Sequence, residues 1–229
     1  MTLASDLFGT KVLISRQWLR EPLVDSGGAE VAYSITSPAK ATVGRVSALG
    51  AGGWFSRSFP AGGPPGGGAA FARTKFSTTP GEGFTAFVGN PYQNVVSVST
   101  WAVNGDGSSR FIRNAGSVVL CKAAPAIGIN SGGAYGRRGL ASDCIGDVKR
   151  DGENTDGASL GGAPGDQADQ QGIGLTFPQG GKNSLIPVGH GVGGVGRWRV
   201  LGGSETFEWE IVPGCGLICI EWFTQDPGY

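Results

Sequence analysis

The stretch Gly62-Gly63-Pro64-Pro65-Gly66-Gly67-Gly68 runs almost directly into Ala70-Phe71-Ala72-Arg73-Thr74-Lys75-Phe76-Ser77-Thr78. Glycine loses more backbone entropy on folding than any other residue, so the first part does not order itself unless something compensates. The second part alternates in the period of two that is expected of a half-buried β-strand. The junction between them predicts β-strands that frame glycine-rich loops.

Glycine is concentrated in two tracts. It occupies 8 of the 19 positions from 50 to 68 and 20 of the 69 positions from 128 to 196, out of 43 glycines in 229 residues. A flexible linker is disfavoured, because the second tract also carries apolar residues that favour burial. Collagen requires glycine at every third position, and no such period is sustained here.

A third interpretation is packed polyproline-II (PPII) backbone. A PPII helix has three residues per turn and no internal hydrogen bonds, so side-by-side packing must satisfy its N–H and C=O groups. Only glycine lets backbones approach that closely. The sequence favours ordered PPII-like loops and leaves irregular ordered loops and disorder as alternatives.

The segments between the tracts predict strands. Residues 70–78, the turn Thr79-Pro80-Gly81-Glu82-Gly83 and residues 84–89 together predict a β-hairpin. No segment has a 3.6-residue apolar period, so we expect little helix. The predicted fold is all-β, an antiparallel β-sandwich or jelly-roll-like framework with glycine-rich loops. Further strand candidates are residues 29–36, 42–49, 94–103, 109–112, 117–122, 197–201, 205–211 and 216–223.

The first 40 residues differ from the rest, with apolar anchors such as Trp18 set among charges. We interpret residues 1–40 as a short β-rich N-terminal attachment segment and residues 41–229 as the glycine-rich β-domain. The alternative is that residues 1–40 are a packing arm of the main domain.

Charge and composition exclude several classes of protein. Eighteen basic and 18 acidic residues give zero formal charge, which argues against a nucleic-acid binder. No apolar stretch is long enough for a membrane helix, and the N-terminus does not resemble a secretory signal, so we expect assembly in a cytoplasm. Four cysteines and one histidine, His190, make metal binding improbable, and we expect no metal and no cofactor.

No residue pattern indicates catalysis. The chain has neither a Gly-x-Ser-x-Gly elbow nor a nucleotide-binding loop that follows a strand. A glycosidase would need a pair of carboxylates placed about a glycosidic bond, and nothing marks out such a pair. We therefore expect no enzyme. The available acidic residues are Asp143, Asp147, Asp151, Glu153 and Asp156.

The order of the motifs resembles the glycine-rich domain of tail-fibre and minor tail proteins of tailed bacteriophages. The resemblance covers roughly residues 41–223, although the glycine runs here are shorter and more interrupted. The motifs are Gly50-Ala51-Gly52-Gly53, Gly67-Gly68-Ala69-Ala70-Phe71, Thr79-Pro80-Gly81-Glu82, Phe87-Val88-Gly89, Gly107-Ser108-Ser109-Arg110-Phe111, Ile145-Gly146-Asp147-Val148-Lys149 with Gly152, and Gly216-Leu217-Ile218-Cys219-Ile220-Glu221-Trp222.

This resemblance implies a structural protein of the virion that is assembled in the bacterial host cytoplasm and mediates host-surface recognition. The implied partners are other tail or fibre proteins and a host-surface polysaccharide or outer-surface protein, and fibre proteins imply a homo-oligomer such as a trimer. The candidate receptor-binding residues are the aromatic residues in or beside the tracts: Trp54, Phe55, Tyr92 and Tyr135. The alternative is a purely architectural head-fibre, decoration or connector protein.

Overall fold

The structure is a computed structural model that describes residues 13–24, 30–53, 67–90, 107–126, 138–152, 195–201, 204–211 and 214–226. The described residues form antiparallel β-sheets, and their only helical segments are two three-residue 3-10 turns, Ala115–Ser117 and Ala141–Asp143. None of the described helices is long and apolar enough to cross a membrane.

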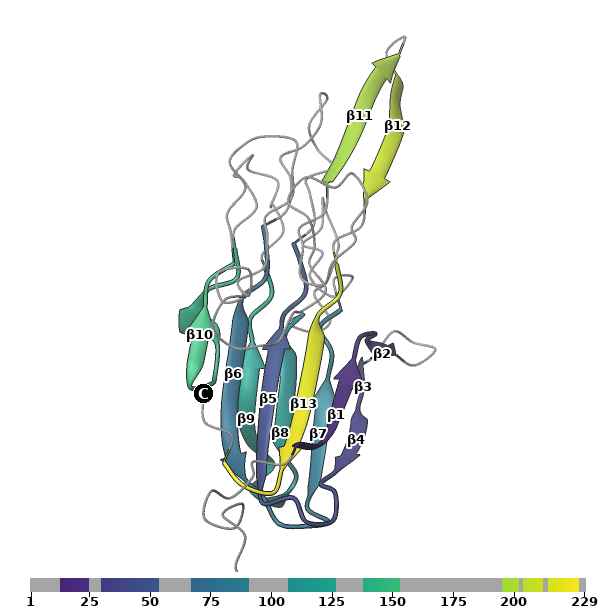
Figure 1. The fold of residues 1–229 in the computed structure, drawn as a ribbon. Helices are drawn as coiled ribbons and strands as arrows, with labels where there is room; N and C mark the ends of the chain where they lie inside the picture. Colours follow the sequence, from purple (N-terminus) through teal and green to yellow (C-terminus); the bar gives the residue numbers. More distant parts are fainter. Residues whose placement is uncertain are drawn as a thin grey trace, which may run out of the picture.

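Two sheets pack face to face (Figure 1). The five-stranded sheet has the order β1 (Leu13–Leu19), β13 (Leu217–Phe223), β5 (Val43–Leu49), β6 (Phe71–Ser77) and β10 (Val148–Arg150). The four-stranded sheet has the order β4 (Tyr33–Thr36), β7 (Gly83–Phe87), β8 (Ser109–Arg113) and β9 (Val118–Ala123). Two short pairs, β2 (Leu23–Val24) with β3 (Glu30–Val31) and β11 (Val195–Leu201) with β12 (Ser204–Ile211), complete the strands. The predicted all-β sandwich is confirmed.

An aromatic cluster fills the space between the sheets. Phe76 and Trp222 come from the five-stranded sheet, and Phe84 and Phe111 come from the four-stranded sheet. The Phe84 and Phe111 rings stack with centroids 5.1 Å apart, and Trp222 meets Phe76 edge-on at 5.8 Å. Gly44 leaves room for this cluster, because a Cβ there would lie 2.2 Å from Cζ of Phe76.

The predicted hairpin of residues 70–78 with residues 84–89 is wrong. β6 pairs with β5 and β10, whereas β7 pairs with β4 and β8, so the turn between them crosses from one sheet to the other. The turn closes on the β4–β5 connection instead: Ser37 N donates to Glu82 O at 2.9 Å, and Gly81 N donates to Ser37 O at 3.1 Å. An alternating pattern identifies a strand but does not identify its neighbour.

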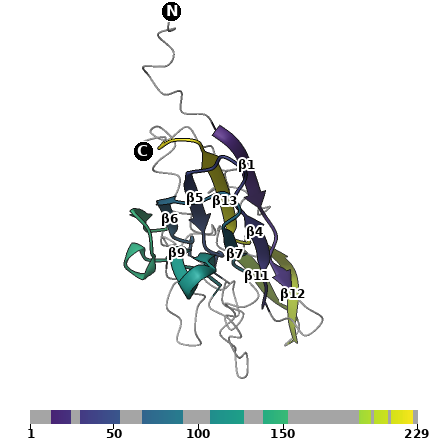
Figure 2. The ribbon, with the colours of Figure 1, turned by 90° about the horizontal axis from the view of Figure 1, so that it is seen from below.

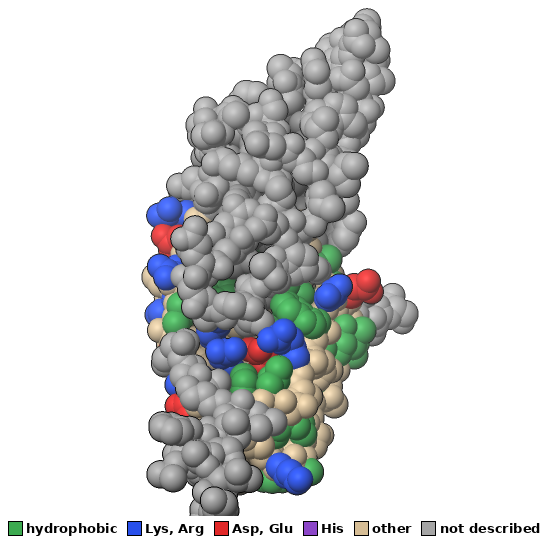
Figure 3. Space-filling view, viewed as in Figure 1, with side chains coloured by type: hydrophobic (Ala, Val, Ile, Leu, Met, Phe, Trp, Pro, Cys, Tyr) green, Lys and Arg blue, Asp and Glu red, His purple; other side chains and the backbone are tan. Residues whose placement is uncertain are grey.

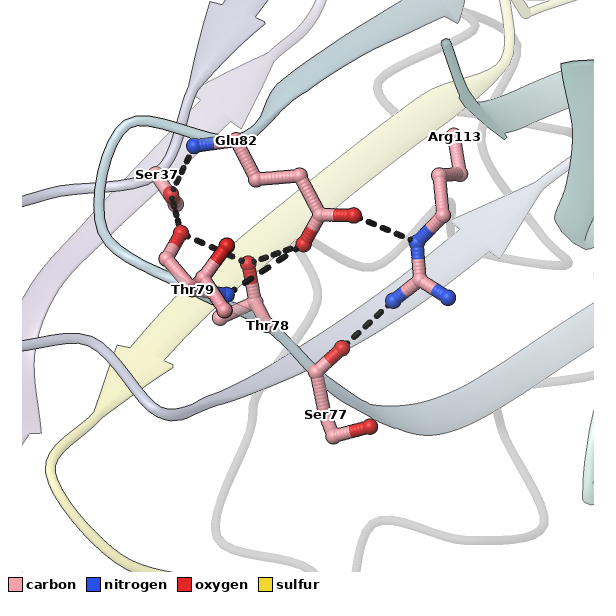
Figure 4. A network of polar contacts seen from close by, with 6 residues as sticks. All are labelled: Ser37, Ser77, Thr78, Thr79, Glu82 and Arg113. Atoms are coloured by element: carbon pink, nitrogen blue, oxygen red, sulfur yellow. Dashed lines mark hydrogen bonds and ion pairs between the residues drawn. The ribbon is translucent and has the colours of Figure 1, made fainter. Parts of the chain in front are cut away.

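A polar network fixes this crossover turn at the end of the sandwich (Figure 4). Glu82 accepts a hydrogen bond from the Thr78 hydroxyl at 2.7 Å and pairs with Arg113 Nε at 2.8 Å. Arg113 also donates to the carbonyl of Ser77, and the Ser37 hydroxyl donates to the carbonyl of Thr79 at 2.6 Å. The network therefore ties loops of both sheets together at one end of the molecule.

Strands from the first 40 residues are built into both sheets. β1 pairs with β13, and β4 pairs with β7. Arg16 and Arg45, on either side of β13, both bind Glu221, with shortest N–O distances of 2.7 and 2.8 Å. Figure 3 shows this face, where basic and acidic side chains lie together among hydrophobic ones. β1 and β4 thus pair with strands of the predicted main domain. The division at residue 40 and an attachment role for residues 1–40 stay predictions.

Two variants of β7 test the placement of the core. Phe84 is fully buried between the sheets, whereas Phe87, three residues on, is half-buried beneath the Arg110 guanidinium at 4.5 Å. We expect Phe84→Ala to lower the free energy of unfolding by about 3–5 kcal/mol. The matched variant Phe87→Ala should cost about 1 kcal/mol. Urea unfolding measures both, and equal losses would contradict this register.

Candidate functional site

The ends of the glycine-rich tracts meet at one end of the sandwich, opposite the crossover turn (Figure 1). Gly53 N donates to Gly67 O at 3.0 Å, which joins the two sides of the first tract. Gly139 N donates to Gly68 O at 2.9 Å, and Gly152 N donates to Gly139 O at 3.0 Å. We call this array the glycine bundle; it comprises residues 50–53, 67–70, 89–90, 107–108, 124–126, 138–139, 152 and 214–216.

Residues 50–53 are hydrogen-bonded in the repeat of a PPII helix. Their four successive N–H groups donate to Ala70 O (3.2 Å), Gly107 O (3.0 Å), Gly214 O (3.0 Å) and Gly67 O (3.0 Å). The first and the fourth therefore bind the same neighbouring segment, and the two between bind two others. A donor direction that recurs at every third residue is the threefold symmetry of PPII. The hydrogen bonds of this stretch agree with packed PPII-like backbone, and PPII conformation of the glycine tracts stays a prediction.

Glycine is required in the glycine bundle because neighbouring backbones leave no room for a Cβ atom. An added Cβ would lie 2.0 Å from Gly68 O at Gly152, 2.3 Å from Ala124 O at Gly50 and 2.4 Å from Ala70 N at Gly139. Real Cβ atoms do not approach other atoms below 3.0 Å. The obstructing atoms belong to backbone that is itself hydrogen-bonded, so no side-chain movement can relieve the clash.

Ser109 joins the strands to the glycine bundle. Its hydroxyl donates to Leu49 O at 2.5 Å and accepts from Gly89 N at 2.9 Å, and the residue is fully buried. Gly216 lies against this hydroxyl, with its Cβ position 2.2 Å from Ser109 Oγ, and donates its own N–H to Gly89 O at 2.8 Å. One side chain thus links three segments where pleated strand gives way to PPII-like backbone. The sequence placed Ser109 in a motif but gave no indication of this role.

The acidic residues of the 138–152 loop bind protein groups. Asp147 accepts hydrogen bonds from the Thr74 hydroxyl at 2.9 Å and from Lys75 N at 3.0 Å. Asp151 pairs with Arg138 at 2.9 Å and accepts from Ala141 N at 2.7 Å. These carboxylates hold the loop against β6 and close its ends. Asp143 lies in the 3-10 turn of the same loop, and Glu153 and Asp156 lie outside the described residues.

The four cysteines are free thiols. Burial raises the pKa of Cys121, Cys144 and Cys215, and it raises the pKa of Cys219 to about 12. Because the thiolate is the nucleophile and the metal ligand, such thiols are unreactive near neutral pH. Within the part of the chain that the structure describes, no group of three or more His, Cys, Asp or Glu residues could hold a metal ion.

The four predicted receptor-binding residues, Trp54, Phe55, Tyr92 and Tyr135, lie outside the described residues. Their described neighbours belong to the glycine bundle. Trp54 follows Gly53 directly, Tyr92 follows Asn90 by two residues, and Tyr135 lies between Ala126 and Arg138. The structure therefore brings together the described residues that flank these aromatic residues in the sequence, while the position of the aromatic residues themselves stays a prediction.

A pair of glycine variants tests the close packing of the glycine bundle. We expect Gly50→Ala to lower the free energy of unfolding by at least about 2 kcal/mol. The added methyl would push residue 50 and the Ala124 backbone apart, and this movement would strain the hydrogen bond from N of residue 50 to Ala70 O. The control is Gly83→Ala, where the new methyl meets only the side-chain amide of Asn114, at 3.0 Å. It should change the unfolding free energy by less than about 1 kcal/mol. Urea denaturation measures the unfolding free energy of both variants. An unfolding free energy of Gly50→Ala equal to that of the unaltered protein would refute the close packing.

Thiol labelling gives an independent test of burial. At pH 8 a thiol with a pKa of about 12 is almost wholly protonated, so Cys219 should react slowly with iodoacetamide in the native protein. Cys121, which is fully buried, should behave in the same way. Mass spectrometry should find all four cysteines alkylated in denaturant. Rapid labelling of Cys219 without denaturant would show that solvent reaches β13 in the native protein.

Comparison with known proteins adds no relative to this description. No protein-family model matches the sequence, and no curated protein matches it at the significance threshold.

Proposed function

We propose that the chain is a virion protein of a tailed bacteriophage, a tail-fibre or minor tail component that presents glycine-rich tracts to the host surface. The observation that supports this proposal is that the two ends of the sandwich differ. β1 begins and β13 ends at one end of the sandwich, where Leu13 pairs with Phe223. The glycine bundle lies at the opposite end (Figure 1).

This difference between the two ends supports attachment to the virion at one end and recognition of the host surface at the other. Figure 2 views the sandwich from the end at which β1 begins. The polar network of Ser37, Glu82 and Arg113 holds the connecting loops there, which gives a preformed surface for docking onto another virion protein. The tracts leave from the other end, and loops held by a rigid scaffold are where proteins commonly place binding residues.

The chemistry of the described residues also favours display over catalysis. The glycine bundle offers backbone amides that are already hydrogen-bonded to one another, and the carboxylates of the 138–152 loop are engaged in holding that loop. Aromatic residues set in rigid loops contribute large contact areas at low conformational cost. We therefore assign host contact to Trp54, Phe55, Tyr92 and Tyr135.

Binding to host cells tests the proposal. Fluorescently labelled protein should bind susceptible cells and compete with the phage for adsorption. The double variant Trp54→Ala with Tyr135→Ala should bind at least about tenfold more weakly, because truncated aromatic anchors commonly cost more than 1 kcal/mol. Phe87→Ala is the control, since it removes a ring from a sheet face. Unchanged binding by a folded double variant would refute the assignment of these residues.

Labelling on the particle separates recognition from the architectural alternative. An antibody against a peptide tag at the C-terminus should mark the particle-proximal end of a fibre or tail tip, with the glycine tracts pointing outward in a density map. Burial of the tracts among neighbouring virion proteins would instead favour a head-fibre, decoration or connector protein.

A further inference from the structure

The two sheets of the sandwich have four edge strands, and three of these are short or covered. β10 and β4 contain only three and four residues. β9 has six residues, but Lys122 and Ile145 exchange backbone hydrogen bonds of 2.9 Å in both directions, so the 138–152 loop covers part of its edge. Short edge strands and covering loops are common protections against pairing with other chains.

The fourth edge strand, β1, is long. Its seven residues form one end of the five-stranded sheet, and in the described parts of the chain β13 is the only strand that pairs with it. Ser15, Arg16 and Gln17, at the centre of β1, are exposed. The N–H and C=O groups on the outer side of an edge strand are a template for a further strand from another chain.

Exposed apolar side chains lie near both ends of β1. Leu13, at its beginning, is exposed, and so are Leu23 and Val31, which pair with each other in β2 and β3. Figure 1 shows β2 and β3 near the C-terminal end of β1, on the side away from β13. A strand added along β1 would therefore run from Leu13 toward this apolar pair.

The centre of β1 carries a positive charge. Arg16 and Arg45 share the single carboxylate of Glu221, with N–O distances of 2.7 and 2.8 Å. The Glu221 side chain is 1 % exposed, whereas that of Arg16 is 39 % exposed. Two guanidinium groups with one carboxylate leave one positive charge in excess, and Arg16 presents it at the edge of the sheet. Arg20 and Glu21, which follow β1, carry opposite charges and add no net charge.

We propose that β1 is the docking site for an extended acidic segment of another protein, which adds to the five-stranded sheet as a further strand. Backbone hydrogen bonds along β1 would hold the segment, and apolar residues near its ends would cover Leu13 and the pair of Leu23 with Val31. An Asp or Glu opposite Arg16 would lie on the same face of the sheet and balance the excess charge. A basic segment would be repelled there.

The charge of the edge strands excludes a second copy of the chain as the occupant. The four edge strands of the two sheets, β1, β4, β9 and β10, contain no Asp or Glu. Pairing β1 with any of these strands from another copy would supply no carboxylate for Arg16. The inference goes beyond the proposed function, because it names a protein contact that does not depend on recognition of the host.

Selection from a random library of seven-residue peptides, the length of β1, on the immobilised full chain tests the docking site. We expect the selected peptides to share apolar residues near their ends and an Asp or Glu near the middle. With the tightest peptide bound, amide hydrogen exchange should slow in residues 13–19 and stay unchanged in β10. N-methylation of one set of alternate peptide amides should abolish binding and methylation of the other set should be tolerated, because alternate amides of a strand point to opposite sides.

A double-mutant cycle tests the charge pair. Arg16→Gln should weaken the peptide about threefold, the effect of one exposed ion pair. Replacing the acidic peptide residue with its amide should cost the same in the unaltered chain and nothing further in Arg16→Gln. Lys149→Gln is the matched control, since it removes an exposed positive charge from β10 and should leave the affinity unchanged. Thermal unfolding checks that both variants are folded.

Four results would overturn the inference. The first is a selection that yields no binding peptide or only peptides without an acidic residue. The second is slowed exchange outside residues 13–19 with no change inside them. The third is an equal effect of the two sets of N-methyl groups, which would show that the peptide does not bind as a strand. The fourth is self-association of the chain with slowed exchange in residues 13–19 and no peptide present, which would identify a second copy as the occupant.

Discussion

The glycine bundle depends on hydrogen bonds between backbones that lie too close together for a Cβ atom. Fixing a residue costs about 1–2 kcal/mol of conformational free energy, and an intramolecular hydrogen bond returns about 0.5–1.5 kcal/mol net. Glycine-rich backbone by itself is therefore near balance or unfavourable. Ordered structure at Gly50, Gly139 and Gly152 needs neighbours that are already in register.

The five-stranded sheet supplies that register. Leu49 of β5 pairs with Phe71 of β6, and the same alignment continues past both strands as Gly50 N to Ala70 O and Gly53 N to Gly67 O. Ser109 carries the alignment across to the four-stranded sheet, because its hydroxyl binds both Leu49 O and Gly89 N. The sandwich thus acts as a template: its core contributes the hydrophobic stabilisation that glycine cannot, and its strand ends position the backbones for PPII-like packing.

The sequence predicted strands well where one strand was long and alternating, as in residues 70–78. It also predicted close backbone packing in the glycine-rich tracts, which the hydrogen bonds of residues 50–53 show. It failed where the outcome depends on distant partners. The predicted hairpin was wrong because the turn forms its hydrogen bonds with Ser37, which lies more than forty residues upstream of Glu82. β10 was missed because its three residues lie in a polar insertion and become a strand only against β6. The Glu221 ion pairs join residues 176 and 205 positions apart, which no local pattern indicates.

These failures and successes have a common cause that bears on function. The local sequence pattern specifies where the backbone is extended and where side chains are absent. The glycine bundle shows both an extended backbone and an absence of side chains at its close contacts. Long-range pairing decides which loops share an end of the molecule, and here it separates the crossover turn from the glycine bundle. Under the proposed function, the aromatic residues of the tracts have to be held away from the attachment end, and this needs a rigid separation. Packed backbone provides it at Gly152 and Gly139, where any side chain larger than hydrogen would collide with hydrogen-bonded neighbours. The same constraint leaves specificity to the residues that interrupt or cap the tracts, since the glycines themselves have no side chains with which to recognise a partner.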